Sequence, residues 1–378
     1  MKPSLKTLIL ALCIAAVTFS MASAQQGELV LWDMPFSSAF PGGIALDNGL
    51  LYVAANGARE IIRLDPSQDQ FRSWGVSEHP QDVIVVDGVV FCTVRPANHI
   101  SYFNPESLGT TTSRLPFTDA DMDEIHRGQD TTDGNTVLWI ANRHPHGFLR
   151  YEYDAAQAPV IAGSPSDYAA TRATSTIELT TEAVEYEKFS YDITLIPDPF
   201  PLDIDASSTP YTQWTIPVEE DVSVTDLAVA DDGTLWVSAG LPFLFKYDPV
   251  AETIQMLETI QNVMIFQGLL SAADGSIWFS NIVEGSIGHL NPATGLSEVW
   301  RIQGVTEIYD LAFDSAGNIW FTDRIGGTIG KLSPAINESV LYPLGEDSEP
   351  LFLLVDDADI IWFSAGGGNF VGRLNPSP

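Results

Sequence analysis

Basic residues are scarce in this chain of 378 residues, where 17 lysines and arginines stand against 50 aspartates and glutamates. The formal net charge is −33. Binding to a nucleic-acid backbone requires lysine and arginine to displace counterions, and anionic membrane surfaces attract the same side chains. The scarcity therefore excludes nucleic acid as a partner. We expect a soluble monomer in which nearly all acidic residues cover the loops and outer strands.

Cysteine is also rare, with Cys13 and Cys92 as the two examples. Cys13 lies in a segment that we expect to be removed, so no intrachain disulfide is expected. Cys92 falls in a β-rich run, and we interpret it as a buried packing residue. The stability of the fold must therefore come from its core and its closure.

Long apolar runs are limited to one, from Leu8 to Phe19. It is too short for a membrane-spanning helix, which needs about 20 apolar residues. Lys2 and Lys6 precede the run and Ala22-Ser23-Ala24 follows it, which is the pattern of a secretory signal peptide. We expect residues 1–24 to be cleaved near Ala24. Residues 25–378 would then form a single secreted or periplasmic domain without stable membrane insertion.

What the sequence does contain is a repeat. Trp236, Trp278, Trp320 and Trp362 follow one another at intervals of 42 residues. Around each lies a β-rich run, a tight turn, the tryptophan strand and a third strand. Earlier copies carry another aromatic residue or tryptophan at this place, namely Tyr52, Phe91 and Trp139. A period of about 40–45 residues with a repeated aromatic predicts an all-β, seven-bladed β-propeller of four-stranded antiparallel blades.

Closure of the ring follows from a count of strands. Six copies are followed by a fourth strand, but the seventh ends with the chain. The segment from Glu28 to Met34 has the pattern of a fourth strand. We predict that this N-terminal strand completes the last blade and removes its exposed edge.

One interval departs from the repeat period, because Trp139 and Trp236 are 97 residues apart. The surplus is an insertion at about residues 154–210, between the third and fourth strands of blade 3. Within it, Phe189, Tyr191, Ile193 and Leu195 alternate with polar residues, which predicts a strand. An inserted hairpin or arm fits better than an eighth blade, which would lack the glycine turn and the tryptophan strand.

Two later copies, Gly275–Leu290 and Gly317–Leu332, resemble the G-x-L-W-F-T-E…N-x-I-G-R-I blades of streptogramin B lyases. Blade 1 is also similar to an NHL repeat. The resemblance implies a Mg²⁺-dependent lyase that opens a lactone, with a histidine where the first strand begins and a glutamate after the aromatic strand. In the last blade these places hold Leu351 and Ala365, which can neither move protons nor bind metal. The scaffold resembles the lyase, but the catalytic pair is absent there. Gluconolactonase-type enzymes are less similar.

Three groups remain on the face where the first strands begin. Arg95, Arg143 and Arg324 occupy equivalent positions and predict a ligand site for an anion, unless each pairs with a local acid. Asp82, Asp226 and Asp310 are candidate ligands for Mg²⁺ or Ca²⁺, unless they bind turn amides. His126 and Asp323 are the candidate catalytic residues. With His144 and His146, His126 forms an imidazole cluster that could hold a transition metal, or the His-Pro-His loop is simply exposed.

Two functions follow. The first is an exported binding or scaffold protein that holds a small anionic or carbohydrate ligand, or a protein, at the mouth of the central channel. The alternative is a divergent metal-dependent lyase or lactonase acting on a cyclic ester, with His126 as base. No G-x-S-x-G, H-E-x-x-H or P-loop motif occurs, so the sequence gives no support to a standard hydrolase or nucleotide site.

Overall fold

The computed structural model describes residues 27–376 of the chain, apart from several internal gaps. The gaps are residues 97–98, 106–110, 115–120, 130–135, 144–146, 154–164, 176–185, 193, 196–199, 202–203, 209–210, 217–222, 240–242, 259–265 and 283. Every regular element in the described part is a β-strand. The described residues contain no helix with the length and apolar character needed to cross a membrane. The expected signal segment, residues 1–24, lies outside them.

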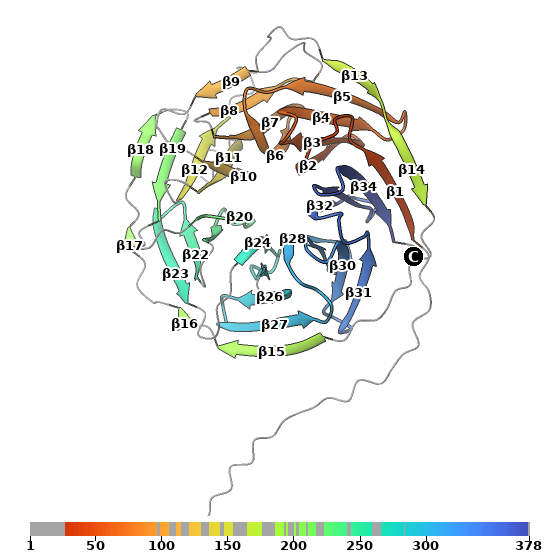
Figure 1. Cartoon of the computed structure of the whole chain (residues 1–378). Helices are drawn as coiled ribbons and strands as arrows, with labels where there is room; N and C mark the ends of the chain where they lie inside the picture. Colours follow the sequence, from red (N-terminus) through yellow and green to blue (C-terminus); the bar gives the residue numbers. More distant parts are fainter. Residues whose placement is uncertain are drawn as a thin grey trace, which may run out of the picture.

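Seven antiparallel sheets stand around a common centre, with the first strand of each sheet innermost (Figure 1). Blade 1 contains β2 (Pro41–Asp47), β3 (Leu50–Ala55), β4 (Glu60–Asp65) and β5 (Gln70–Gly75). Blade 2 contains β6 (His79–Val86), β7 (Val89–Arg95), β8 (His99–Phe103) and β9 (Thr111–Arg114). Blade 3 contains β10 (Met122–Gln129), β11 (Thr136–Asn142), β12 (Gly147–Glu152) and β19 (Tyr211–Thr215). Blade 4 contains β20 (Asp226–Val229), β21 (Leu235–Ser238), β22 (Phe243–Asp248) and β23 (Thr253–Glu258).

The remaining three blades follow the same order. Blade 5 contains β24 (Phe266–Ser271), β25 (Ile277–Asn281), β26 (Ser286–Asn291) and β27 (Leu296–Ile302). Blade 6 contains β28 (Ile308–Phe313), β29 (Ile319–Asp323), β30 (Thr328–Ser333) and β31 (Glu338–Pro343). Blade 7 contains β32 (Pro350–Val355), β33 (Ile361–Ala365), β34 (Phe370–Asn375) and, from the other end of the chain, β1 (Glu28–Asp33). The seven-bladed propeller predicted from the repeat is confirmed.

The repeated residues have the roles that the period predicts. The turn between the first two strands needs a positive φ, which Gly317 adopts at 78° and Asp359 adopts at 57° in the last blade. The tryptophans lie buried in apolar clusters formed between neighbouring blades; Trp362 of blade 7, for example, packs with Val53 of blade 1. The core is therefore a series of seams around the ring.

The N-terminal strand closes the ring as predicted. β1 pairs antiparallel with β34, from Glu28 opposite Asn375 to Asp33 opposite Phe370. Trp32 is buried and stacks on Trp362 with ring centroids 6.1 Å apart. The first and last parts of the chain thus share one sheet.

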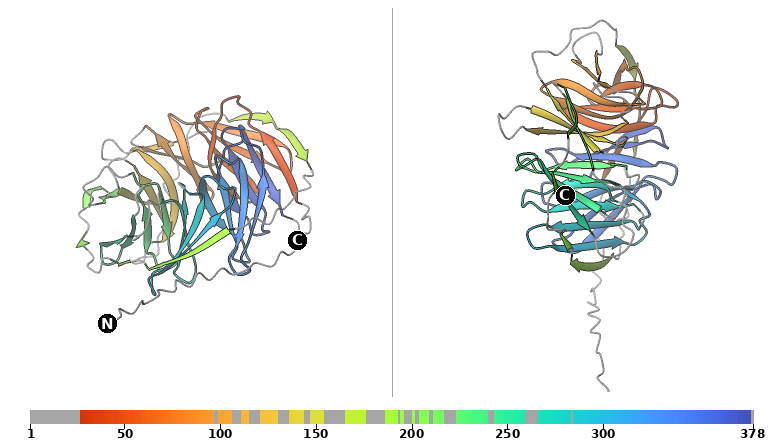
Figure 2. Two further views of the ribbon diagram at one scale, coloured as in Figure 1. Left: turned by 60° about the horizontal axis from the view of Figure 1, so that its bottom comes forward. Right: turned by 90° about the vertical axis from the view of Figure 1, so that its left-hand side faces the viewer.

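The insertion in blade 3 is not a local hairpin. Its strands are β13 (Ser166–Ala169), β14 (Thr171–Ser175), β15 (Tyr186–Asp192), β16 (Thr194–Leu195), β17 (Phe200–Pro201) and β18 (Ile204–Ser208). β13 pairs with β5 of blade 1, β14 with β1 of blade 7, and β15 with β27 of blade 5. β16 and β17 pair with β23 of blade 4, and β18 returns to β19 of blade 3. We call these six strands the belt, because together they follow the outside of the ring (Figures 1 and 2).

The belt crosses the closing seam between blades 7 and 1. β13 and β14 are separated by one residue, Ala170, whose amide donates to the Asp69 carbonyl at 2.8 Å. Asp167 pairs with Arg72 at 2.7 Å, and Arg172 lies 3.6 Å from Asp69. β1 is therefore an internal strand, held by β34 on one side and by β14 on the other.

Candidate functional site

Bulges at the start of the first strands shape the centre of the ring. The pairing register shifts in six of the inner strands, for example between Pro80 and Val83 of β6 and between Ile308 and Leu311 of β28. A bulge bends its strand and re-aims the side chains of the extra residues. The polar side chains of these positions and their neighbours form what we call the central cluster: Asp82, Asp123, Glu124, His126, Asp226, Tyr309 and Asp310.

In blade 3 the bulge brings forward two acids that the sequence comparison missed. Met122 pairs with Asn142 as Pro80 pairs with Val94, so Asp123 is the residue equivalent to Gln81. The sequence comparison had placed His126 there. The connection between β10 and β11 is longer than in the other blades, so counting back from the tryptophan gives the wrong register.

Arg95 and Arg143 are both bound to acids, as the alternative interpretation expected. Arg95 contacts Asp121 at 2.7 Å and Asp123 at 3.0 Å. Arg143 donates from Nε to the other oxygen of Asp123 at 2.5 Å, and its Nη2 also contacts that oxygen. We call this arrangement the arginine clamp. It brings two of the three predicted arginines onto one carboxylate, and Asp123 itself was not among the predicted site residues.

Arg324 and Asp323 lie in blade 6 and belong to a different set of contacts. Arg324 Nε donates to Glu307 at 2.5 Å. Asp323 is fully buried, and its carboxylate accepts the amides of Thr306 at 3.1 Å and Glu307 at 2.9 Å, with a further bond from Gly326. Through these bonds Asp323 orders the loop that contains Thr306 and Glu307.

The three predicted metal ligands lie in equivalent positions without converging on one point. Asp82, Asp226 and Asp310 each accept two backbone amides, one from the next residue and one from the following blade. The amides from the following blade are those of Ile125 at 3.1 Å, Leu269 at 2.6 Å and Leu353 at 2.8 Å. These bonds join blades 2 to 3, 4 to 5 and 6 to 7. We call them the aspartate latches, and they match the expectation that aspartate binds amides here.

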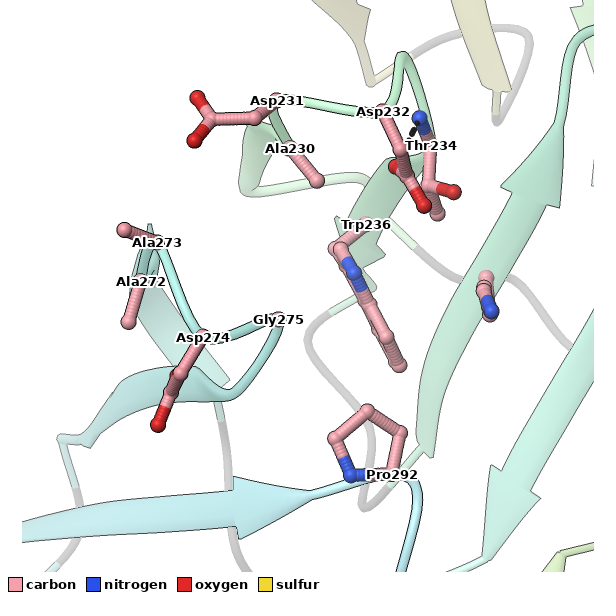
Figure 3. A pocket seen from close by; sticks show the side chains of 11 residues that line it. Ala230, Asp231, Asp232, Thr234, Trp236, Ala272, Ala273, Asp274, Gly275 and Pro292 are labelled. Carbon is pink, nitrogen blue, oxygen red and sulfur yellow. Dashed lines mark hydrogen bonds between the residues drawn. The ribbon is translucent and has the colours of Figure 1, made fainter.

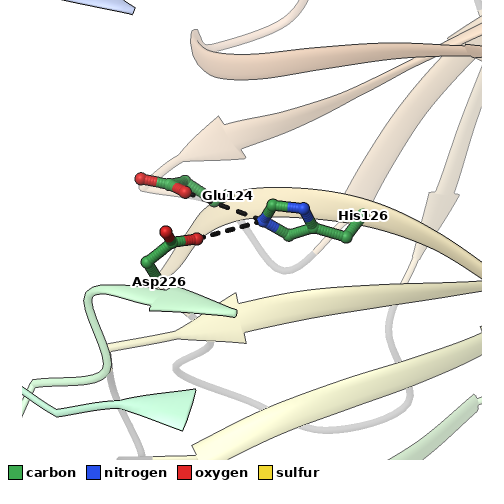
Figure 4. A group of neighbouring side chains, drawn as sticks. All are labelled: Glu124, His126 and Asp226. Carbon is green, nitrogen blue, oxygen red and sulfur yellow. Dashed lines mark hydrogen bonds and ion pairs between the residues drawn. The ribbon is translucent and has the colours of Figure 1, made fainter. Parts of the chain in front are cut away.

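A different trio converges. Ligand atoms of Glu124, His126 and Asp226 all lie within 4.8 Å of one another, and no second such group occurs among the residues that the structure describes. His126 Nε2 is 3.1 Å from Asp226 Oδ1 and 3.7 Å from Glu124 Oε2 (Figure 4). Asp226 comes from β20 and the other two from β10, so the trio spans blades 3 and 4. His144 and His146 lie outside the described residues.

Burial sets the electrostatics of the central cluster. Burial raises the pKa of Asp82 to about 6 and that of Asp310 to about 7. The pKa of Glu124 is raised well above its ordinary value, first by burial and then by the neighbouring Asp226. Burial works against protonation of His126, but the nearby Asp226, Asp82 and Asp310 outweigh it and raise its pKa. The centre of the ring is thus a buried site rich in carboxyl groups.

Asp310 gives a test of this electrostatic description. Its pKa in the folded protein is about 7, against an ordinary value of 3.8. Between these two pH values the folded carboxyl binds a proton that the unfolded chain releases. The contribution of this carboxyl to the free energy of unfolding is therefore full below pH 3.8 and is lost as the pH rises to 7. We expect Asp310→Asn to unfold with a free energy that declines less between pH 4 and pH 7 than that of the wild type, measured by urea denaturation.

Asp359→Asn is the control for that experiment. Asp359 is on the surface, and hydrogen bonds from Ser315 lower the pKa of its carboxyl. The stability that Asp359 contributes is therefore lost only as the pH falls below 3.8, its ordinary pKa. This lies outside the pH range over which Asp310 changes the stability. Equal slopes for wild type and Asp310→Asn would show that Asp310 does not carry the proton.

An aromatic pair lies beside the central cluster. Tyr309 of blade 6 and Phe352 of blade 7 meet edge to face with ring centroids 5.5 Å apart, and both are half-buried. Burial raises the pKa of Tyr309, and the nearby charge of Asp123 adds to this shift. Polar groups of blades 2 to 4 and aromatic rings of blades 6 and 7 therefore share the centre.

A separate cavity of about 290 Å³ lies between blades 4 and 5 (Figure 3). Its walls include Asp232 and Asp274 in the turns after the first strands, at the far end from the central cluster, together with Trp236 and Lys246. Asp232 and Asp274 accept the amides of Thr234 and Ser276, both at 2.9 Å. These carboxylates shape turns. None of the predicted site residues lines this cavity.

Cys92 is buried and free, as predicted. Burial raises the pKa of its thiol to about 12, so the reactive thiolate is disfavoured.

Comparison with solved structures identifies the fold. A streptogramin B lyase matches with a TM-score of 0.69 at 18% identity, over 94% of this chain and 99% of that one. A catalytically inactive variant of virginiamycin B lyase from Staphylococcus aureus with quinupristin matches with a TM-score of 0.68 at 15% identity, over 93% and 99%. A chain of a mitotic checkpoint complex matches with a TM-score of 0.62 at 12% identity, over 99% and 100%. No family model and no curated protein matches the chain. At these identities the likeness concerns the fold alone.

Proposed function

We propose that this chain, which has the propeller fold of the solved streptogramin B lyases, is an exported protein that binds a carbohydrate at the centre of the ring. The observation that supports this most is the arginine clamp on Asp123, which shares the centre of the ring with Tyr309. Sugars are commonly held by planar charged side chains that exchange hydrogen bonds with hydroxyl groups, while an aromatic ring covers the apolar face. Both elements are present here.

The charge balance favours a neutral ligand over an anion. Arg95 and Arg143 already share the carboxylate of Asp123, which occupies the position that a ligand carboxylate would take. Glu124 and Asp226 lie close by and would repel a second anion. Sugar hydroxyls can donate to Asp123 and accept from the guanidinium groups without adding charge.

Blade 7 supports binding over lyase chemistry. Leu351 directly follows Pro350, which pairs with Ala365 across β32 and β33. These are the places where the resemblance to the lyases puts the histidine and the glutamate. A leucine and an alanine cannot transfer a proton.

Arg143→Ala is expected to weaken binding of the best neutral oligosaccharide from a glycan panel by about ten- to a hundredfold. A hydrogen bond from a charged group contributes about 1.5–3 kcal/mol, and each 1.4 kcal/mol is a factor of ten. Tyr309→Ala should cost about three- to tenfold through lost stacking. Isothermal titration calorimetry measures both changes.

Arg127→Ala is the matched control, because Arg127 is exposed and, among the described residues, its ion pair is with Asp87 at 3.7 Å. It should bind like the wild type. Tighter binding of sulfate or citrate than of any neutral sugar would contradict the carbohydrate assignment and favour an anion. Binding that survives Arg143→Ala and Tyr309→Ala unchanged would place the ligand elsewhere.

A lyase or lactonase that acts on a cyclic ester is the second candidate, and the trio of Glu124, His126 and Asp226 is the observation that favours it. The Mg²⁺ implied by the resemblance prefers oxygen ligands in octahedral geometry. The trio contains an imidazole nitrogen, which does not fit that preference. The carboxylates of the aspartate latches already accept backbone amides, so they do not fit it either. Turnover of any member of a lactone panel, lost in EDTA and restored by a divalent ion, would support this candidate.

A further inference from the structure

The trio of Glu124, His126 and Asp226 presents one nitrogen and two carboxylates to a common point. Asp226 is 2% exposed, and the amides of Leu227 and Leu269, both at 2.6 Å, fix the orientation of its carboxylate. Metal ligands are commonly oriented by such outer bonds. The arrangement therefore includes both the ligand atoms and the support behind them.

Glu124 is the observation that points to a bound ion. Its side chain is 12% exposed and lies beside His126 and Asp226 (Figure 4). In the described part of the chain no backbone amide or hydroxyl donates to its carboxyl group, whose hydrogen-bonding neighbour is the carboxyl group of Asp226. Two buried carboxyl groups so close together are costly when both are charged, so they hold either a shared proton or a cation between them.

The neighbouring cations cannot supply that charge. Arg95 and Arg143 are engaged with Asp121 and Asp123. His126 carries at most one positive charge, while Glu124 and Asp226 can carry two negative charges between them. Asp82 and Asp310 add to the negative field at the imidazole.

We propose that Glu124, His126 and Asp226 bind one divalent transition-metal ion, of the Zn²⁺ or Mn²⁺ class, that joins blade 3 to blade 4. An imidazole nitrogen with two carboxylates suits Zn²⁺, Mn²⁺ and related ions, whereas Ca²⁺ and Mg²⁺ prefer sites made of oxygen. Three protein ligands leave positions for water or a ligand hydroxyl.

The location gives the ion a structural consequence. The aspartate latches join blades 2 to 3, 4 to 5 and 6 to 7, but the seam between blades 3 and 4 has instead the contact of His126 with Asp226. An ion held there would bind the two blades together. Its effect on stability is therefore separate from any carbohydrate binding or turnover.

The test uses the full chain after removal of metal with EDTA and desalting. Titration calorimetry with Zn²⁺, Mn²⁺, Mg²⁺ and Ca²⁺ should give one equivalent of Zn²⁺ or Mn²⁺, bound at least ~100-fold more tightly than Mg²⁺ or Ca²⁺. Thermal unfolding should shift upward with that ion, because ligands that bind the folded state stabilise it. Glu124→Gln and His126→Gln should each lose at least ~100-fold in affinity, since even changes behind the ligands cost about 10–100-fold.

His289→Gln is the matched control, because His289 is a half-buried histidine that packs against Trp278 in blade 5, with the two rings tilted by 32°. It should keep the wild-type affinity. Unchanged affinity in His126→Gln would overturn the assignment, and so would a wild-type protein that binds none of the four ions, which would indicate a proton shared by Glu124 and Asp226. X-ray absorption of the Zn²⁺-loaded wild type is independent of whether the variants fold. It should show one imidazole ligand, and a spectrum without one would also overturn the proposal.

Discussion

Removal of residues 25–36 should leave a protein with little or no cooperative unfolding transition. The deletion takes away β1, the strand that completes blade 7, and with it the buried side chains of Leu29, Val30 and Trp32. Burial of a Leu or Val side chain contributes about 1.5–3 kcal/mol, and loss of a buried tryptophan costs about 3–5 kcal/mol. Together these approach the whole stability of a typical domain, about 5–15 kcal/mol.

The measurement is urea denaturation followed by far-ultraviolet circular dichroism and tryptophan fluorescence. The deletion also leaves β14 without its partner, so the loss extends to the belt. As a control, a shorter truncation that removes residues only through Gln26 keeps β1 and should unfold like the chain that begins at residue 25. A chain without residues 25–36 that unfolds at the same urea concentration would show that β1 does not close the ring.

Excision of the belt should give the second large effect. Tyr151 and Tyr211 face each other in adjacent strands, so residues 153–209 can be replaced by Asn-Gly, a two-residue hairpin turn. The shortened chain should still form four-stranded blades, but its free energy of unfolding should fall by about 5 kcal/mol or more. Even five ladder hydrogen bonds contribute about 1 kcal/mol each, and the belt adds strands to five blades.

The excision should also change how the protein associates. β5, β27 and β1 become edge strands when the belt is absent, and unpaired edges promote pairing between chains. Size-exclusion chromatography should therefore show larger species for the shortened chain. Arg72→Ala is the control, because it removes one surface ion pair from the belt and should cost less than about 1 kcal/mol. A shortened chain with the stability and the oligomeric state of the wild type would show that the belt only lies on the surface.

The repeat was sufficient to predict the ring and its closure, because the tryptophan and turn positions are determined by local φ angles and by packing between blades. Glu28–Met34 could be assigned to the last blade for the same reason, since it has the pattern of a missing strand. The path of the insertion could not be predicted. Belt strands are held by backbone hydrogen bonds, which every residue type except proline can form. The sequence of a belt strand therefore does not indicate which blade it will join.

The site residues likewise include some that the repeat revealed and some that it did not. Asp82, Asp226 and Asp310 were recognised as a periodic set, but their partners are amides 43 residues further along, which no local pattern reveals. Glu124 and Asp123 were missed because the longer connection after β10 hides the register of blade 3. Nearly all acids were expected on the loops and outer strands, and the buried exceptions include Asp82, Asp123, Glu124, Asp226 and Asp323.

The belt has a consequence for the order of folding. β14 pairs with β1 near the start of the chain, whereas β15 pairs with β27 more than a hundred residues after it. Contacts so distant in sequence form slowly, because long loops must close first. The belt can therefore dock completely only after the late blades have been synthesised and folded. Until then the outer edges are open, and the net charge of −33 keeps chains apart through mutual repulsion.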